Sequence, residues 1–149
     1  MKSIFDAPDR KEVLQRISSL SETSRPQWGK MTVAQMVKHC SLCEDYYFGN
    51  IVIGRSILGR LIGQKALRSI LKDEQSVIAR NAPTSPHFII RDADLKLNQE
   101  KERWISLVEK YESYDHPEFV HWFFGPMTKA QLGQFIYKHC DHHLRQFGA

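Results

Sequence analysis

Apolar residues recur at helical spacing in four stretches of the chain. The first two stretches span about residues 8–20 and 32–48, and the other two span about residues 92–111 and the segment that begins at Thr128. Apolar positions three or four residues apart lie on one face of a helix. Because the connections are short to moderate and no strand periodicity stands out, we expect an all-α fold, an antiparallel up-and-down four-helix bundle.

Two of the four helices have clear start signals. Thr32 is followed three residues later by Gln35, and Thr128 is followed in the same way by Gln131. This spacing is typical of a capping box, in which the hydroxyl and the amide side chain bind each other's backbone N–H groups. The second and last helices should therefore begin directly after the two threonines.

The remaining boundaries are less regular. Asp92 or Asp94 is expected to cap the third long helix. The segment after residue 50 is interrupted by three glycines and predicts a broken or short helix before a surer one at 65–72: Gly54, Gly59 and Gly63. Residues 115–126 are interpreted as a connection to the last helix.

Composition indicates one globular domain over residues 1–149. The chain is 42% hydrophobic and 26% charged, which is ordinary for a domain of this size. It has no run of about 18 apolar residues and no signal-peptide pattern at its N-terminus, so we expect a cytoplasmic protein without membrane insertion. Its three cysteines, an odd number, argue against a disulfide framework.

The net charge of +4 is unevenly distributed. No acidic residue lies between Asp45 and Asp73, whereas five basic residues alternate there with apolar ones: Arg55, Arg60, Lys65, Arg68 and Lys72. Such a segment could lie on an anionic membrane surface or attract an acidic ligand, although the pattern is most often a solvated helix face. No nucleic-acid-binding motif accompanies the charge, so we expect no nucleic-acid partner.

His139 and His143 lie one turn apart in the last predicted helix. Residues i and i+4 project from the same face with Cβ atoms about 5–6 Å apart, so two imidazoles can converge on one metal ion. The apolar stripe formed by Leu132, Phe135 and Ile136 continues through both histidines. Both side chains should therefore point into the core.

His39 is the best candidate for a third ligand. In helical projection it lies close to Met36 and Cys43, so it belongs to the buried stripe of the second helix. Because three ligands must reach one point, we expect the second and last helices to be neighbours. Cys43 lies one turn after His39 and could approach the same metal, although core packing is its commoner role.

Buried histidines also have a simpler interpretation. One inward histidine is more often a hydrogen-bonded core residue than a metal ligand. Two neutral imidazoles side by side change that balance, because each unsatisfied nitrogen costs about 1–3 kcal/mol and one ion satisfies several of them. Spacing alone leaves a metal site and a polar core pair equally open.

Two segments resemble a known family. Residues 28–39 (WGKMTVAQMVKH) and two parts of the last 26 residues, FGPMT at 124–128 and HCDHHLRQFG at 139–148, are similar to motifs of the DinB/YfiT-like superfamily, whose members are regarded as four-helix metalloenzymes. The closest likeness is to an uncharacterised branch that ends in His-x-x-His-His-Leu-x-Gln-Phe. The resemblance implies that His39, His139 and His143 bind a divalent metal that keeps open coordination positions.

Three neutral histidines without a carboxylate suit zinc or nickel and leave room for water or a thiol. Gln146 projects close to the direction of His139 and could hydrogen-bond a ligand imidazole or the substrate. His121, in the connection before the last helix, could act as an acid or a base at the rim. Gln146 and His121 are therefore the candidate catalytic residues, and His142 is assigned beside the metal ligands rather than among them.

The leading hypothesis is a metal-dependent transferase that uses a low-molecular-weight thiol on a small electrophilic substrate, an activity implied by the resemblance. A metal-dependent hydrolase and a non-catalytic helical module with a structural metal remain as alternatives. A closed site with a fourth protein ligand would favour the structural module, and Cys43 is the residue to inspect for that closure. The sequence leaves homodimer formation open.

Overall fold

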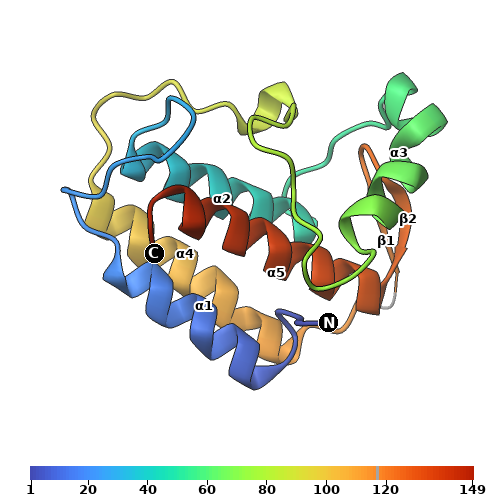
Figure 1. The fold of residues 1–149 in the computed structure, drawn as a ribbon, viewed down its shortest axis with the longest axis horizontal. Coiled ribbons are helices and arrows are strands. Elements are labelled where there is room, and N and C mark those ends of the chain that lie inside the picture. The colour runs from blue at the N-terminus through green and yellow to red at the C-terminus, as the bar shows by residue number, and fades with distance from the viewer. Residues whose placement is uncertain (117) are drawn as a thin grey trace.

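The computed structural model describes residues 1–116 and 118–149 and contains helices and one small sheet (Figure 1). The α-helices are α1 (Ala7–Ser19), α2 (Val33–Tyr47), α3 (Ile57–Ile70), α4 (Leu97–Glu109) and α5 (Lys129–Gln146). The shorter elements are the 3-10 helices η1 (Pro86–Phe88) and η2 (Lys110–Ser113) and the strands β1 (Glu118–His121) and β2 (Gly125–Thr128).

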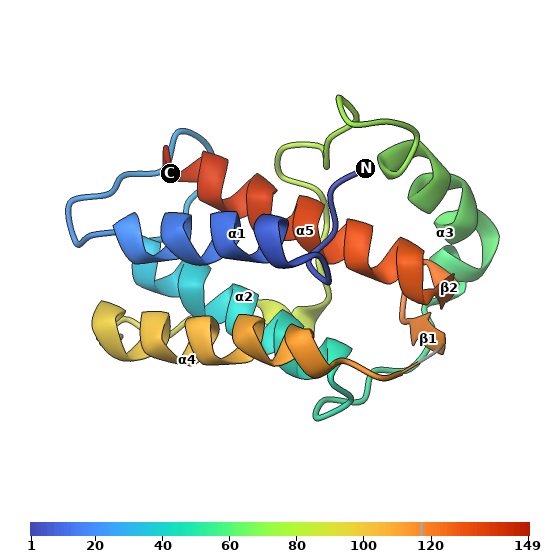
Figure 2. The ribbon, with the colours of Figure 1, turned by 90° about the horizontal axis from the view of Figure 1, so that it is seen from below.

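Helices α1, α2, α4 and α5 pack together, with α2 against α4 and α1 between α4 and α5. Helix α3 and the β1–β2 hairpin lie at one end of this group, outside the other four helices (Figures 1 and 2). Helix α2 also contacts α5, as the three-histidine hypothesis requires. None of the helices in the described residues has both the length and the apolar character needed to cross a bilayer.

The expected four-helix bundle fold is wrong. The described residues form five α-helices and a two-stranded antiparallel sheet, with 54% helix and 5% strand in total, which is a mixed arrangement rather than an all-α one. The hairpin lies in the segment interpreted as a connection, and it pairs Phe119 with Met127 and His121 with Gly125. Each strand has four residues, so the period-two pattern is too short to stand out in the sequence.

The two expected capping boxes are confirmed. Thr32 accepts a hydrogen bond from the backbone N–H of Gln35, and the Gln35 side chain accepts one from the backbone of Thr32. Thr128 and Gln131 make the same pair of hydrogen bonds at the start of α5. These local interactions satisfy backbone donors that the first helical turn leaves unpaired.

The expected start of α4 at Asp92 or Asp94 is wrong. The helix begins at Leu97, and no side chain caps it. Asp92 instead forms an ion pair with Lys38, and its carbonyl oxygen accepts a hydrogen bond from the Gln35 side chain. This aspartate therefore ties the preceding loop to α2 rather than starting a helix.

The glycines of α3 do not break it, contrary to the expectation of a broken or short helix. Gly59 and Gly63 lie on the buried side of α3, where a Cβ on either would overlap the backbone carbonyl oxygen of Phe123. Gln64 adds hydrogen bonds from its side-chain amide to the carbonyl oxygens of Phe124 and Pro126. Helix α3 thus approaches the hairpin more closely than any larger residue would allow.

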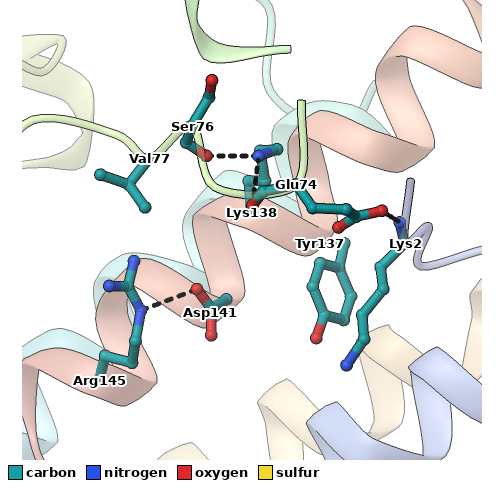
Figure 3. A pocket seen from close by; sticks show the side chains of 8 residues that line it. All are labelled: Lys2, Glu74, Ser76, Val77, Tyr137, Lys138, Asp141 and Arg145. Atoms are coloured by element: carbon teal, nitrogen blue, oxygen red, sulfur yellow. Dashed lines mark hydrogen bonds and ion pairs between the residues drawn. The ribbon is translucent and has the colours of Figure 1, made fainter. Parts of the chain in front are cut away.

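The loop after α3 is held by Lys138, which is buried on α5. Its ammonium donates hydrogen bonds to the backbone carbonyl oxygens of Asp73, at 2.8 Å, and of Ser76 (Figure 3). Carbonyl oxygens replace water around the charge, which is the condition for burying a lysine. These hydrogen bonds hold the segment that follows α3 against the surface of α5.

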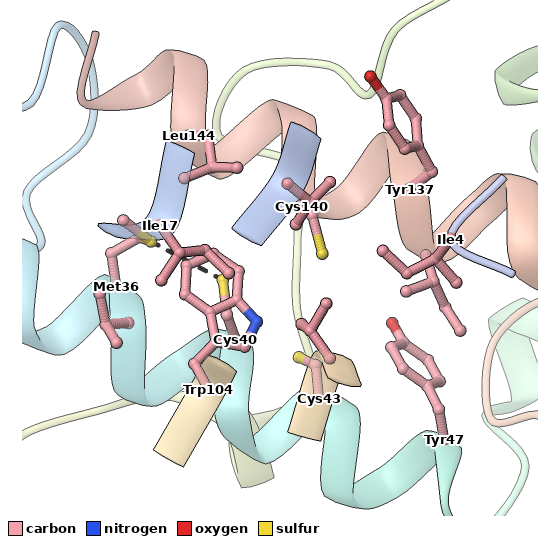
Figure 4. Close-up of a cluster of buried hydrophobic side chains, with 14 of the residues drawn as sticks. Ile4, Ile17, Met36, Cys40, Cys43, Tyr47, Trp104, Tyr137, Cys140 and Leu144 are labelled. Carbon is pink, nitrogen blue, oxygen red and sulfur yellow. Dashed lines mark hydrogen bonds between the residues drawn. The ribbon is translucent and has the colours of Figure 1, made fainter. Parts of the chain in front are cut away.

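The core between the helices also contains a buried carboxyl group. Figure 4 shows part of this core, with aromatic and sulfur-containing side chains such as Trp104 and Cys140. Glu44 on α2 is fully buried and accepts hydrogen bonds from Trp104 Nε1 at 3.2 Å, Cys140 Sγ at 3.5 Å and the Tyr111 hydroxyl. Burial raises the pKa of Glu44 to about 7, even though these donors favour the charged form.

This raised pKa predicts a pH-dependent stability. In the unfolded chain Glu44 should titrate near its ordinary pKa of 4.5, so the folded protein retains a proton up to about pH 7 that the unfolded chain has already lost. The free energy of unfolding should therefore fall by about 3 kcal/mol, relative to Glu44→Gln, as pH rises from about 4.5 to above 7. Urea unfolding of both proteins, stripped of metal, at the two ends of this range measures the difference. A constant difference would show that Glu44 takes up no proton in the folded state.

Candidate metal centre

Helices α2 and α5 supply the candidate ligands. His39 lies in the middle of α2 among buried residues, and its neighbours Met36 and Cys43 on the same face are buried too. His139 and His143 occupy successive turns near the end of α5, whose buried residues include Leu132 and Ile136 earlier on the same stripe. The periodicity that places apolar side chains in the core therefore places the histidines there as well.

The three predicted ligands lie together. The ring centroid of His143 is 4.8 Å from that of His39 and 4.8 Å from that of His139. The rings of His39 and His139 are 5.6 Å apart. Three imidazoles from two helices thus contact one another, although 100 residues of chain separate His39 from His139.

A cysteine joins this cluster. His39, Cys43 and His139 each offer a ligand atom, and these atoms lie within 4.8 Å of one another. Cys43 Sγ is 3.8 Å from His39 Nε2. His143 is not part of this group, although its ring packs against both other imidazoles. The donor set within reach of one point is therefore nitrogen and sulfur, which suits zinc or nickel.

A backbone carbonyl orients His39. Its Nδ1 lies 2.8 Å from the carbonyl oxygen of Phe88 in η1. Because a carbonyl oxygen only accepts, Nδ1 must carry the proton, and the lone pair of the neutral ring is then on Nε2. A hydrogen bond on the far nitrogen of a metal-binding imidazole is the usual way in which proteins fix its tautomer.

Gln146 does the same for His143. Its Oε1 lies 2.9 Å from His143 Nδ1, and its Nε2 donates to the carbonyl oxygen of Trp28 at 2.8 Å. The second contact fixes which end of the amide faces His143, so His143 Nδ1 is the donor and Nε2 carries the lone pair. Gly29 makes room for this arrangement, because its φ is +81° and a Cβ there would lie 2.7 Å from Gln146 Nε2.

His139 has a buried nitrogen without a partner. Its Nδ1 is inaccessible to solvent and makes no hydrogen bond within the described residues. Such an atom costs about 1–3 kcal/mol, which a bound cation or the hydrogen bonds of a ligand would offset. His139 is also the most exposed of the three imidazoles, which are otherwise buried, so the cluster is closest to solvent at this residue.

All three imidazoles are held neutral. Burial lowers the pKa of His39, and it lowers the pKa values of His139 and His143 well below the ordinary range. The neighbouring histidines lower the latter two pKa values further, because a second positive charge would lie beside the first. Neutral imidazole is the form that binds a metal, so protons compete little with it near neutral pH.

His121 lies in a strand rather than in the expected connection, and it is buried. Its Nδ1 accepts hydrogen bonds from the backbone N–H groups of Phe123 and Phe124, so the proton of the neutral ring is on Nε2. The ring packs 5.6 Å from that of Phe135, which stacks 6.1 Å from His139. Burial, with a smaller effect of Arg55, lowers the pKa of His121 to about 3.

Of two other histidines, His142 lies beside the cluster and His116 does not. His142 is buried with its ring 5.0 Å from that of His143 and 5.5 Å from Trp28, beside the candidate ligands as expected. His116 is exposed and contacts Tyr114, away from the three imidazoles.

Gln146 was expected to hydrogen-bond a ligand imidazole or the substrate, and it contacts His143. The two supporting backbone carbonyls could not be predicted from the histidine spacing. The carbonyl groups of Trp28, in a loop, and of Phe88, in the short helix η1, belong to the backbone. Because every residue has a backbone carbonyl, the residue types do not show which one will contact a side chain. The pair Trp28-Gly29 was part of the recognised motif, and the left-handed backbone of Gly29 is the physical reason why a glycine stands there.

Two surface cavities lie elsewhere on the molecule. One has a volume of about 40 Å³ and lies on the outer side of α5, next to Tyr137, Lys138 and Asp141 (Figure 3). The other, near the N-terminus, has a volume of about 410 Å³ and is lined by Phe5 and Lys129 among others. Neither is lined by one of the three candidate metal ligands.

Comparison with known proteins identifies the family. A family model described as a protein of unknown function (DUF1569) matches residues 2–149. The chain belongs to the DUF1569 family. No curated protein and no solved structure matches this DUF1569 chain.

The hypothesis that His39, His139 and His143 bind a metal predicts which variants of this DUF1569 chain lose it. His139→Ala or His143→Ala should lower bound zinc or nickel from about one ion per chain to almost none, because losing one of three ligands removes most of the affinity. His116→Ala is the matched control, since His116 is exposed and contacts Tyr114 rather than the three imidazoles. Metal analysis of tag-free protein after dialysis checks this. Equal metal content in all three variants would contradict the assignment.

Proposed function

We propose that this protein is a metal-dependent enzyme that joins a low-molecular-weight thiol to a small electrophile. His39, His139 and His143 would hold the zinc or nickel ion. The observation that carries the proposal is the set of tautomers: two of the imidazoles commit Nδ1 to a hydrogen bond, which leaves each Nε2 lone pair available to a cation. The resemblance of both histidine motifs to the DinB/YfiT-like superfamily supports the same ligand set.

A bound divalent ion would lower the pKa of a coordinated thiol, so that thiolate forms near neutral pH. The protein itself contributes position. Gln146 holds His143, the Phe88 carbonyl holds His39, and both are positioning groups rather than reacting ones. In the transfer the thiolate sulfur would form a bond to the electrophilic carbon, the bond from that carbon to its leaving group would break with the leaving group taking the electron pair, and the proton of the thiol would pass to solvent.

His121 would serve as a hydrogen-bond donor in this reaction. Its low pKa keeps it neutral at physiological pH, and its Nδ1 is already occupied by two backbone N–H groups. The remaining Nε2–H can donate to an oxygen of the substrate, but the ring has little tendency to take up a proton. We therefore assign it to substrate polarisation rather than to proton transfer.

Metal removal should separate activity from folding. The buried apolar core contains residues from all five α-helices, so the fold should not depend on the ion as that of a zinc finger does. Chelation should leave most of the helical circular dichroism unchanged and abolish transfer of glutathione to chlorodinitrobenzene. Adding zinc or nickel should restore the activity. Undiminished transfer in the metal-free protein would contradict the mechanism, and unfolding on chelation would favour a structural metal.

Cys43 provides the observation that favours this structural alternative. Its sulfur lies among the candidate ligand atoms, and a fourth protein ligand would close the site to substrate. Burial raises the pKa of the Cys43 thiol well above its ordinary value in the metal-free site, but a bound divalent ion would lower it, as it would for a substrate thiol. The proposed reaction requires that Cys43 packs beside the ion without binding it, because a fourth protein ligand would take the position that the substrate thiol needs.

Cobalt substitution tests the role of Cys43. A thiolate bound to Co(II) gives intense near-ultraviolet charge-transfer absorption, whereas imidazole ligands alone do not. We expect the cobalt protein to lack this absorption until an external thiol is added. Absorption without added thiol that disappears in Cys43→Ser but persists in Cys40→Ser would establish the closed site. Cys40 is a suitable control because it is buried on the same helix outside the ligand group.

A further inference from the structure

Helix α3 exposes apolar side chains to solvent. Ile57 is 81% exposed, Leu61 is 79% exposed and Leu58 is 57% exposed. Val52, in the loop before the helix, is 89% exposed. Single exposed apolar residues are common, but these three helical residues share the outer side of the first two turns, and such a cluster marks an interaction surface.

The same side of the helix continues as a basic surface. Ile57, Leu61, Lys65 and Arg68 follow one another at spacings of four, four and three residues, so they form a single stripe along α3. Arg60 and Lys72 are exposed nearby. None of these four basic residues forms an ion pair in the part of the chain that the structure describes, and no acidic residue occurs from 46 to 72.

Other residues of α3 hold the helix against the β1–β2 hairpin. Gly59 and Gly63 contact the backbone of Phe123, and Gln64, at the edge of the exposed stripe, hydrogen-bonds the carbonyl oxygens of Phe124 and Pro126. The helix therefore cannot turn its apolar stripe inward without breaking these contacts. Both ribbon views place α3 at one end of the molecule (Figures 1 and 2).

We propose that the outer stripe of α3 binds the surface of an anionic membrane, with the helix lying in the plane of the interface. Ile57, Leu58 and Leu61 would enter the boundary between headgroups and acyl chains, and Lys65 and Arg68 would contact lipid phosphates or carboxylates. Apolar residues beside unpaired lysine and arginine are the pattern of interfacial helices. The 14-residue helix is too short to span a bilayer, which needs about 20 residues, so binding is peripheral.

Charge decides against a second copy of the chain as the occupant. If two α3 stripes met face to face, each would bring four unpaired basic residues to the contact and no acidic residue of its own helix. Their repulsion would oppose the gain from burying the apolar side chains. An anionic surface has the complementary charge.

Vesicle flotation tests the proposal. The protein should float with vesicles in which about a third of the lipid is phosphatidylserine, and much less with pure phosphatidylcholine vesicles, and added salt should weaken binding. Leu61→Gln and the double variant Lys65→Gln/Arg68→Gln should each reduce partitioning at least about tenfold, because they remove the apolar and the electrostatic contributions.

The matched control is Lys11→Gln/Lys30→Gln, which removes the same charge from exposed positions outside α3 and should keep most of the binding. All substituted residues are exposed, so circular dichroism should show unchanged folding. Equal binding to both kinds of vesicle, no binding to either, or equal losses in the control would overturn the proposal. A dimer in sedimentation that Leu61→Gln dissociates would assign the stripe to a second copy, and an acidic protein that competes with the vesicles would assign it to a protein partner.

Discussion

The need to satisfy polar side chains buried between α2 and α5 determines much of this structure. Each unpaired buried nitrogen or oxygen would cost about 1–3 kcal/mol, so a partner for each of them stabilises the fold. Glu44 is matched by donors on α4, η2 and α5. His39 and His143 are matched by the Phe88 carbonyl and by Gln146. These contacts determine which loops and helices lie against the cluster, and among the three candidate ligands His139 has a buried Nδ1 without a partner in the part of the chain that the structure describes.

The irregular segments take their form from the same requirement. The turn at Gly29 presents the Trp28 carbonyl to Gln146, and η1 presents the Phe88 carbonyl to His39. Neither segment has strong helix or strand periodicity. The position of each one depends on its hydrogen bond to His39 or to Gln146, which its own residues do not reveal. Each of these hydrogen bonds fixes the position of its segment, because losing the contact would leave two polar groups unpaired in the core.

This dependence explains what the sequence could and could not predict. The capping boxes at Thr32 and Thr128 and the inward stripe of α5 follow from residues within a few positions of one another, and they were predicted correctly. The hairpin, the late start of α4 and the continuity of α3 depend on distant partners. Aspartate is a favourable residue type at a helix start, but Asp92 instead forms an ion pair with Lys38 on α2. Gly59 and Gly63 signal a break by local propensity, whereas contact with Phe123 makes small residues necessary there.

The turn between the strands connects the two surfaces to which we assign functions. The backbone N–H groups of Phe123 and Phe124 fix the tautomer of His121. The backbone of Phe123 is also the surface on which Gly59 and Gly63 of α3 pack. From His121 an aromatic contact through Phe135 reaches His139. Because packed interiors resist deformation, the position of this turn constrains the outer helix and the buried ring together. Replacing Gly63 by a larger residue would therefore press on the turn that orients His121, even though α3 carries none of the three candidate ligands.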